Sequence, residues 1–217
     1  MQRRQQADLQ LFRRKRDFLE RTNAPTAYGV NAPQLAELRE LTDRLTALAA
    51  EQETHVRLAR AGTATIRQQM RTLRWDLMRP SELTARRLAP NGVSLGDSFR
   101  VAPSIRHPEA LLTAALAMAQ RAAEHRDTFV ATGLPPGFVE VLHAGALALR
   151  DAVDARAHTL ARRAAVTAEL AALVTHGRRV VSLVESMLGT SVEGDRALAA
   201  EWKSVVRGRA ARRVRSE

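Results

Sequence analysis

The feature that most constrains this chain is a stripe of small and apolar residues at helical spacing between Pro135 and Leu188. Steps of three or four residues are the period of one face of an α-helix. The members are Val139, Leu142, Ala146, Leu149, Val153, Ala157, Leu160, Ala164, Thr167, Ala171, Val174, Gly177, Val181, Val184 and Leu188. Pro135 and Pro136 suit a helix start, and Gly189 suits a stop. We expect one helix of about fifty residues, or two helices broken near Gly177.

A second stripe predicts another long helix from about Pro33 to Arg79. Its members are Leu35, Leu38, Leu41, Leu45, Leu48, Val56, Ala59, Ile66, Met70, Leu73 and Leu77. Pro80 is expected to end this helix, because proline lacks an N–H and disfavours helical dihedral angles at the residue before it. Gly62 could break the helix midway.

Shorter apolar patterns predict three further helices. They lie near residues 8–21, 108–130 and 195–206. The last one places four apolar residues on one side: Leu198, Trp202, Val205 and Val206. Asp195 suits its N-cap.

The predicted fold class is all-α: an up-and-down, antiparallel helical bundle with two long helices, each preceded by a shorter one, plus a C-terminal helix. We expect one elongated domain over residues 1–217. Its parts are two similar halves at about 8–79 and 108–188, a connecting loop at 90–107, a terminal helix at 193–207 and a basic tail at 208–217. Alternation in residues 98–105 permits a short strand there.

The two halves repeat the same layout. A shift of 103 residues lays Pro33 on Pro136 and His55 on His158. Identity over the whole overlap is barely above what a chain rich in Ala and Arg gives by accident. An ancestral duplication therefore stays open, whereas the repeated order of helices is predicted.

Composition agrees with a folded helical protein. Hydrophobic residues make up 45% of the chain and aromatic residues only 4%, with Ala and Leu supplying most of the apolar material. Ala and Leu favour helices over strands. Cysteine is absent, which excludes disulfides and thiolate metal sites. No signal peptide and no membrane span is apparent, so we expect a soluble, cytoplasmic protein.

The net charge of +11 is concentrated at the two ends of the chain. Residues 1–22 carry seven basic and three acidic groups, and residues 203–217 carry six and one. The remainder holds 21 basic and 19 acidic groups, so the trunk is almost neutral. Arg outnumbers Lys 32 to 2, as expected from a GC-rich genome, which weakens the inference that each Arg was selected to bind phosphate.

Two acid–histidine pairs survive the 103-residue shift: Glu51 with His55, and Asp154 with His158. A spacing of four residues puts both members of a pair on one helix face. If the long helices bring the pairs together, two carboxylates and two imidazoles could bind a divalent metal. The alternative is two solvated ion pairs of a few tenths of a kcal/mol each.

No catalytic signature is found. Glu140 and His143 form the Glu-x-x-His pattern of di-iron bundles, but that design needs a second copy, which the chain lacks. There is no nucleophile elbow and no phosphate-binding glycine loop ahead of a lysine. We expect no enzyme and no cofactor.

The C-terminal tail is the strongest charge feature of the sequence. Arg207, Arg209, Arg212, Arg213 and Arg215 crowd into nine residues. Such a run neutralises phosphates in a sequence-independent way. No aromatic residue interleaves for base stacking, and a solvated, frayed end is the alternative interpretation.

These observations leave three functional hypotheses. The leading one is a non-catalytic interaction or structural protein that associates with itself or with other proteins, because apolar stripes on long helices need partners. The second is binding of nucleic acid or another polyanion through the Arg-rich ends. The third is a metal-binding bundle.

Overall fold

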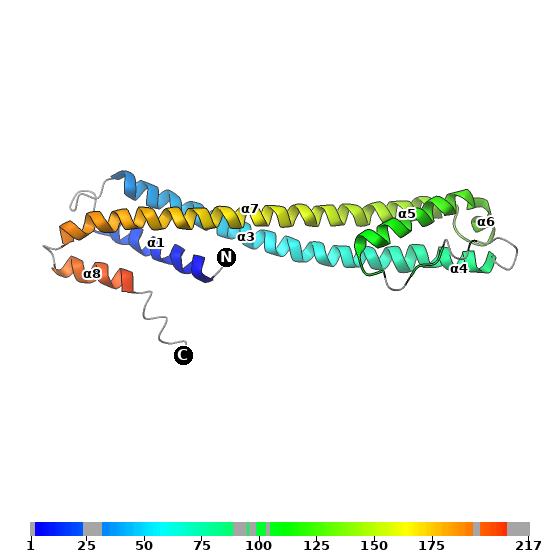
Figure 1. The fold of residues 1–217 in the computed structure, drawn as a ribbon, viewed down its shortest axis with the longest axis horizontal. Coiled ribbons are helices and arrows are strands. Elements are labelled where there is room, and N and C mark those ends of the chain that lie inside the picture. Colours follow the sequence, from blue (N-terminus) through cyan, green and yellow to red (C-terminus); the bar gives the residue numbers. More distant parts are fainter. Residues whose placement is uncertain are drawn as a thin grey trace, which may run out of the picture. The chain divides into compact units, whose positions relative to one another are not determined.

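The computed structural model describes residues 3–23, 32–88, 95, 99–102, 105–192 and 196–207, without the side chains of 190–192, 206 and 207. The all-α prediction is confirmed, since this part of the chain contains helices and no strand. Figure 1 shows α1 (Arg3–Arg21), α3 (Ala32–Arg71), η1 (Thr72–Met78), α4 (Arg79–Leu88), α5 (Pro108–Glu124), α6 (Arg126–Ala131), α7 (Phe138–Val192) and α8 (Arg196–Arg207).

The chain divides into two compact units. Unit 1 combines residues 1–56 with 162–217, and unit 2 is residues 57–161. Both long helices, α3 and α7, contribute to each unit. Unit 1 therefore combines two segments that are far apart in sequence, whereas unit 2 is one continuous segment. The single domain over 1–217 stays a prediction.

The core of unit 1 is formed by α1, α8 and the parts of α3 and α7 in this unit. Gln52 Nε2 donates to Thr167 Oγ1 at 2.9 Å, and His176 Nε2 lies 2.9 Å from Glu37 Oε1, so α3 and α7 run antiparallel. The predicted terminal helix is confirmed by α8, whose Trp202 ring lies 5.1 Å from that of Phe18. Asp195 lies outside the described residues.

Unit 1 also buries charge. Arg178 Nη2 donates to Asp8 Oδ2 at 2.7 Å, and Asp8 is 2% exposed. Lys15 is 3% exposed, donates to Glu185 and lies 5.5 Å from the Trp202 ring centroid. These contacts tie α1 to α7 and α8, because a buried charge is tolerated only with a partner.

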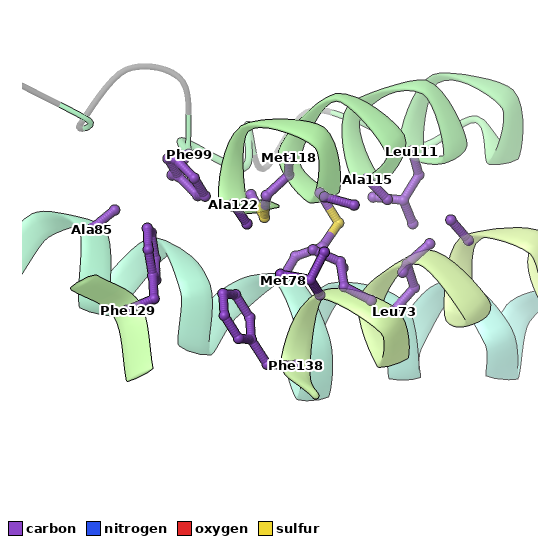
Figure 2. Packing of buried hydrophobic residues seen from close by; sticks show 14 of the residues in the cluster. Leu73, Met78, Ala85, Phe99, Leu111, Ala115, Met118, Ala122, Phe129 and Phe138 are labelled. Carbon is purple, nitrogen blue, oxygen red and sulfur yellow. The ribbon is translucent and has the colours of Figure 1, made fainter. Parts of the chain in front are cut away.

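Unit 2 has a core of aromatic, aliphatic and small side chains. Phe129 lies between Phe99 and Phe138, with ring centroids 5.0 and 5.5 Å away. Figure 2 shows these rings beside Met78 and Met118. The chain of α3 and η1 runs antiparallel to α7 here, since Gly62 lies against Arg156 and Leu77 against Gly145.

Buried positions on α3 recur every seven residues. They are Leu38, Leu45, Gln52, Ala59 and Ile66, and Leu73 of η1 continues the series. A seven-residue repeat is the period of coiled-coil packing, in which one narrow seam faces the partner helix. The predicted stripe is thus confirmed for α3, with the polar Gln52 as an added member.

The prediction that Pro80 ends the second long helix is wrong. The chain passes through the π-helical η1 and continues as α4 to Leu88. The N–H of Arg79 bonds to the carbonyl of Arg74, five residues back, instead of four. A wider turn leaves room for a proline ring that would otherwise clash with the carbonyl four residues before it.

Of the two alternatives left open at Gly62 and Gly177, the continuous helix is found, because α3 and α7 run through both positions. The expected stop at Gly189 lies three residues before the end of α7 at Val192. A glycine costs a helix only about 1 kcal/mol, which neighbouring turns can offset. Gly177 is needed for another reason: a Cβ there would lie 2.6 Å from Cε2 of Phe12.

Part of the predicted α7 stripe is exposed. Ala157, Ala164 and Ala171 face solvent, whereas Val166 and Leu170 are buried. Alanine fits either environment, so the larger side chains decide which face of the helix packs inward.

The predicted helix at 108–130 is two helices, because the backbone leaves helical geometry at His125, with φ −123° and ψ 23°. The second, α6, ends in a Schellman motif. There the N–H of Leu134 bonds to the carbonyl of Phe129, and Gly133 has a φ of +109°. This end turns the chain from Phe129 into α7.

The connecting loop contributes Leu95 and Phe99 to the core of unit 2. The strand permitted at 98–105 is not found among its described residues, 99–102 and 105. Ile105 instead closes a turn through its N–H to the carbonyl of Ala102, and its own carbonyl accepts from Arg74.

Candidate functional site

Unit 2 contains a shallow groove between α5 and α7 with a volume of about 490 Å³. Its lining residues are Leu116, Ala119, Gln120, Ala123, Val139, Glu140 and His143. The groove is apolar except at Gln120, Glu140 and His143, which are all exposed. It therefore contains the Glu-x-x-His pattern.

Glu140 is engaged by neighbours that stabilise its charged form. A hydrogen bond from its own backbone N–H and an ion pair with Arg126 lower the pKa of this carboxyl group below its ordinary value. Its position in the first turn of α7 also favours a negative charge. A carboxylate held in this way is a poor proton acceptor near neutral pH.

The proposed metal ligands are distributed over both units. In unit 1, Glu51 Oε1 lies 3.4 Å from His55 Nε2 and accepts from Arg162 Nε at 3.2 Å. In unit 2, Asp154 and His158 are exposed. Among the described residues, no group of three or more His, Cys, Asp or Glu side chains is placed to hold a metal ion.

The Arg-rich tail is outside the described part of the chain, apart from the backbone of Arg207 at the end of α8. Contacts of Arg207, Arg209, Arg212, Arg213 and Arg215 with a polyanion therefore stay a prediction.

A basic surface that the charge count by chain ends did not reveal lies in unit 2. Residues 57–88 carry eight Arg against Asp76 and Glu82, a net charge of +6. The rest of this unit, residues 89–161, carries six Arg against seven acids, a net charge of −1. The almost neutral trunk thus contains one strongly basic segment, formed by the end of α3, η1 and α4.

Several of these side chains share one helix face. We call the basic face the set Arg60, Arg67, Arg71, Trp75, Arg79, Leu83 and Arg87. Spacings of seven and four residues keep members in line along an α-helix, and the wider turns of η1 keep Trp75 next to Arg71. Trp75 is 59% exposed and Leu83 43% exposed. The spacing of the arginines was visible in the sequence, but the exposure of Trp75 was not.

A second candidate surface is apolar. In unit 2, Leu58 is 50% exposed and Leu160 is half-buried, and neither side chain belongs to a hydrophobic core cluster. Gly62 meets Arg156, so antiparallel helices bring Leu58 and Leu160 to the same level, one turn further along. We call this pair the open seam, together with Val153, which is half-buried and packs against the core of unit 2.

No family model matches the chain, and no curated protein or solved structure is significantly similar to it. None of the described helices combines the length and apolar character that crossing a membrane requires.

Proposed function

We propose that this chain is a non-catalytic helical interaction protein that assembles with a second copy of itself through the open seam. The observation that carries the proposal is Leu58, which is 50% exposed, at the same level of the helix pair as the half-buried Leu160. Apolar side chains in line at helical spacing gain about 25 cal/mol for each Å² that a partner covers.

The packing between the helices supports this proposal. Near the open seam, α3 and α7 meet through Gly62 and through Arg156 Nε, which donates to Thr63 Oγ1 at 3.0 Å. Small and polar contacts bury little apolar area, so this part of the helix pair gains less from its own packing than the cores do. Two such pairs from two chains would form a four-helix arrangement with a shared apolar interior.

Sedimentation equilibrium of the whole protein tests the proposal. We expect a dimer for the natural chain and a monomer for Leu58→Glu/Leu160→Glu, with helical circular dichroism retained. The matched control is Val141→Glu, which places a charge at another apolar side chain of unit 2, 53% exposed, and should leave the dimer intact. A natural chain that sediments as a monomer at all concentrations refutes the proposal.

The remaining hypotheses stay predictions of lower rank. Polyanion binding by the tail is tested by replacing Arg207, Arg209, Arg212, Arg213 and Arg215 with Gln. The metal hypothesis is tested by the metal content of purified protein, with His55→Ala and His158→Ala as comparisons; an equal content in all three contradicts it.

A further inference from the structure

We propose that the basic face binds single-stranded nucleic acid, with its arginines on the phosphates and Trp75 stacked on a base. This inference does not rest on the proposed self-association. It goes beyond the tail hypothesis because it places the contact on a folded helical surface of unit 2.

Charge differs sharply between two segments of the same unit. A genome-wide preference for Arg acts equally on residues 57–88 and 89–161, yet their net charges are +6 and −1. The difference comes mainly from the arginines, which number eight in the 32 residues of the first segment and six in the 73 residues of the second, whereas the acids number two and seven. A segment in which arginines are concentrated and few acids offset them attracts a polyanion from solution.

The guanidinium groups of the basic face are available to a ligand. Arg60, Arg67, Arg71 and Arg87 are exposed and form no ion pair or hydrogen bond with the described residues. They can therefore exchange water for phosphate without breaking a contact within the protein. Arginine suits this role because its planar fork of donors matches phosphate oxygens.

A buried carboxylate keeps two further arginines in place. The side chain of Glu82 is 2% exposed and accepts from Arg79 Nη1 at 2.9 Å and from Arg86 Nη2 at 2.6 Å. The side chains of the two arginines remain 41% and 54% exposed. Glu82 thus holds them at the surface while removing only one charge from the segment.

Trp75 occupies a position within the line of arginines. It follows Arg71 by four residues and precedes Arg79 by four, so it lies between guanidinium groups. Each step is about 6 Å along an α-helix and somewhat less through η1. A line of cations with an aromatic ring between them is the arrangement by which proteins bind single strands, with phosphates paired and bases stacked.

A lipid surface fits these residues less well. A helix that lies on a membrane inserts a broad apolar face, whereas the basic face exposes only Trp75 and Leu83 as large apolar groups. Binding to anionic lipid is therefore an outcome that the test separates from the proposal.

Fluorescence anisotropy with a labelled twenty-nucleotide oligo(dT) measures the binding across salt concentrations. We expect Arg60→Gln/Arg67→Gln/Arg71→Gln to weaken binding at least tenfold and to reduce the salt slope by about 2, or roughly 0.7 for each lost phosphate contact. The matched control, Arg14→Gln/Arg163→Gln/Arg179→Gln, removes as many exposed charges from unit 1 and should keep the natural slope.

Tryptophan fluorescence tests whether Trp75 stacks on a base, because a purely electrostatic contact would leave its emission unchanged. The chain has two tryptophans, and Trp202 packs against Phe18. In the Trp202→Phe variant all indole emission comes from Trp75, and we expect oligo(dT) to quench it. Trp75→Ala should weaken binding about tenfold, and Trp75→Phe should recover most of the loss.

Three outcomes overturn the proposal. One is that the Arg60→Gln/Arg67→Gln/Arg71→Gln variant binds oligo(dT) as tightly as the natural chain, while the variant in which Gln replaces all five arginines of 207–215 no longer binds. Another is unchanged Trp75 emission at saturating oligo(dT). The third is binding to phosphatidylserine vesicles in the absence of any binding to oligo(dT).

Discussion

The two cores of this protein hold charge in different ways, although both are helical. In unit 1 the buried ion pairs Asp8–Arg178 and Lys15–Glu185 each join residues 170 positions apart. In unit 2 the buried Glu82 pairs with Arg79 and Arg86 within its own helix. Charge thus links different helices in unit 1, whereas in unit 2 the core between the helices is apolar.

This difference indicates what each core is sensitive to. A core built on close packing loses stability when volume is removed, because the cavity adds to the lost transfer energy. A core with charge between helices loses stability when one partner is removed, because the other stays buried. We therefore expect substitutions in the two cores to differ in both the size and the cause of their effects.

Phe129→Ala should lower the free energy of unfolding by about 3–5 kcal/mol, because the ring is fully buried between two others. Hydrogen exchange should show the loss of protection in peptides of α5 and the first turns of α7. The control Val141→Ala removes an exposed side chain and should change stability by less than about 0.5 kcal/mol. A small effect of Phe129→Ala would mean that unit 2 repacks freely.

Arg178→Ala should destabilise the protein by about 1–3 kcal/mol, since it takes the arginine from a carboxylate that is 2% exposed. Chemical denaturation measures the effect, and loss of amide protection in α1 locates it in unit 1. Adding Asp8→Asn should recover part of the loss, because the remaining group is then neutral. No recovery would contradict an electrostatic origin.

Two glycine-to-alanine substitutions test whether the side chain next to each glycine can move aside. Gly177→Ala should cost about 1 kcal/mol, because its Cβ meets the buried ring of Phe12 and this overpacking exceeds the gain in helix propensity. Gly145→Ala brings a Cβ to 2.5 Å from Cδ1 of Leu77, a terminal methyl that can rotate away. We expect Gly145→Ala to be neutral or slightly stabilising in thermal unfolding. If Gly145→Ala instead proved the more damaging of the two, Leu77 would be the rigid neighbour and Phe12 the one that yields.

The smallest effect concerns the exposed Glu140 of unit 2. Its lowered pKa means that its stabilising contribution is present above the pKa of the unfolded chain and is lost as pH falls through the folded value. An NMR titration of its carboxyl carbon should show the depressed pKa. Arg126→Gln should raise that pKa only part of the way, because the hydrogen bond from the backbone N–H of Glu140 is the larger cause.

The sequence predicts some features of the candidate surfaces but not others. Seven- and four-residue spacing already places Arg60, Arg67 and Arg71 on one face, so a charge count along each predicted helix would have found the basic face. The direction of Trp75 was not predictable, because it depends on the π-helical turns of η1. The spacing of Glu82 from Arg79 and Arg86 predicts that these side chains pair within one helix. The sequence does not predict that Glu82 is buried.

The sequence by itself determined the helical class and the long helices, because the spacing of Leu and Val along a chain is a local property that hydrogen bonding within the helix preserves. Only the tertiary structure decided that the chain continues past Pro80, that Ala157 and Ala164 face solvent, and that Phe12 fills the space beside Gly177. The physical reason is that each depends on the space a neighbouring segment leaves. Residues distant in the chain set that space, and the spacing of apolar residues along one helix carries no information about them.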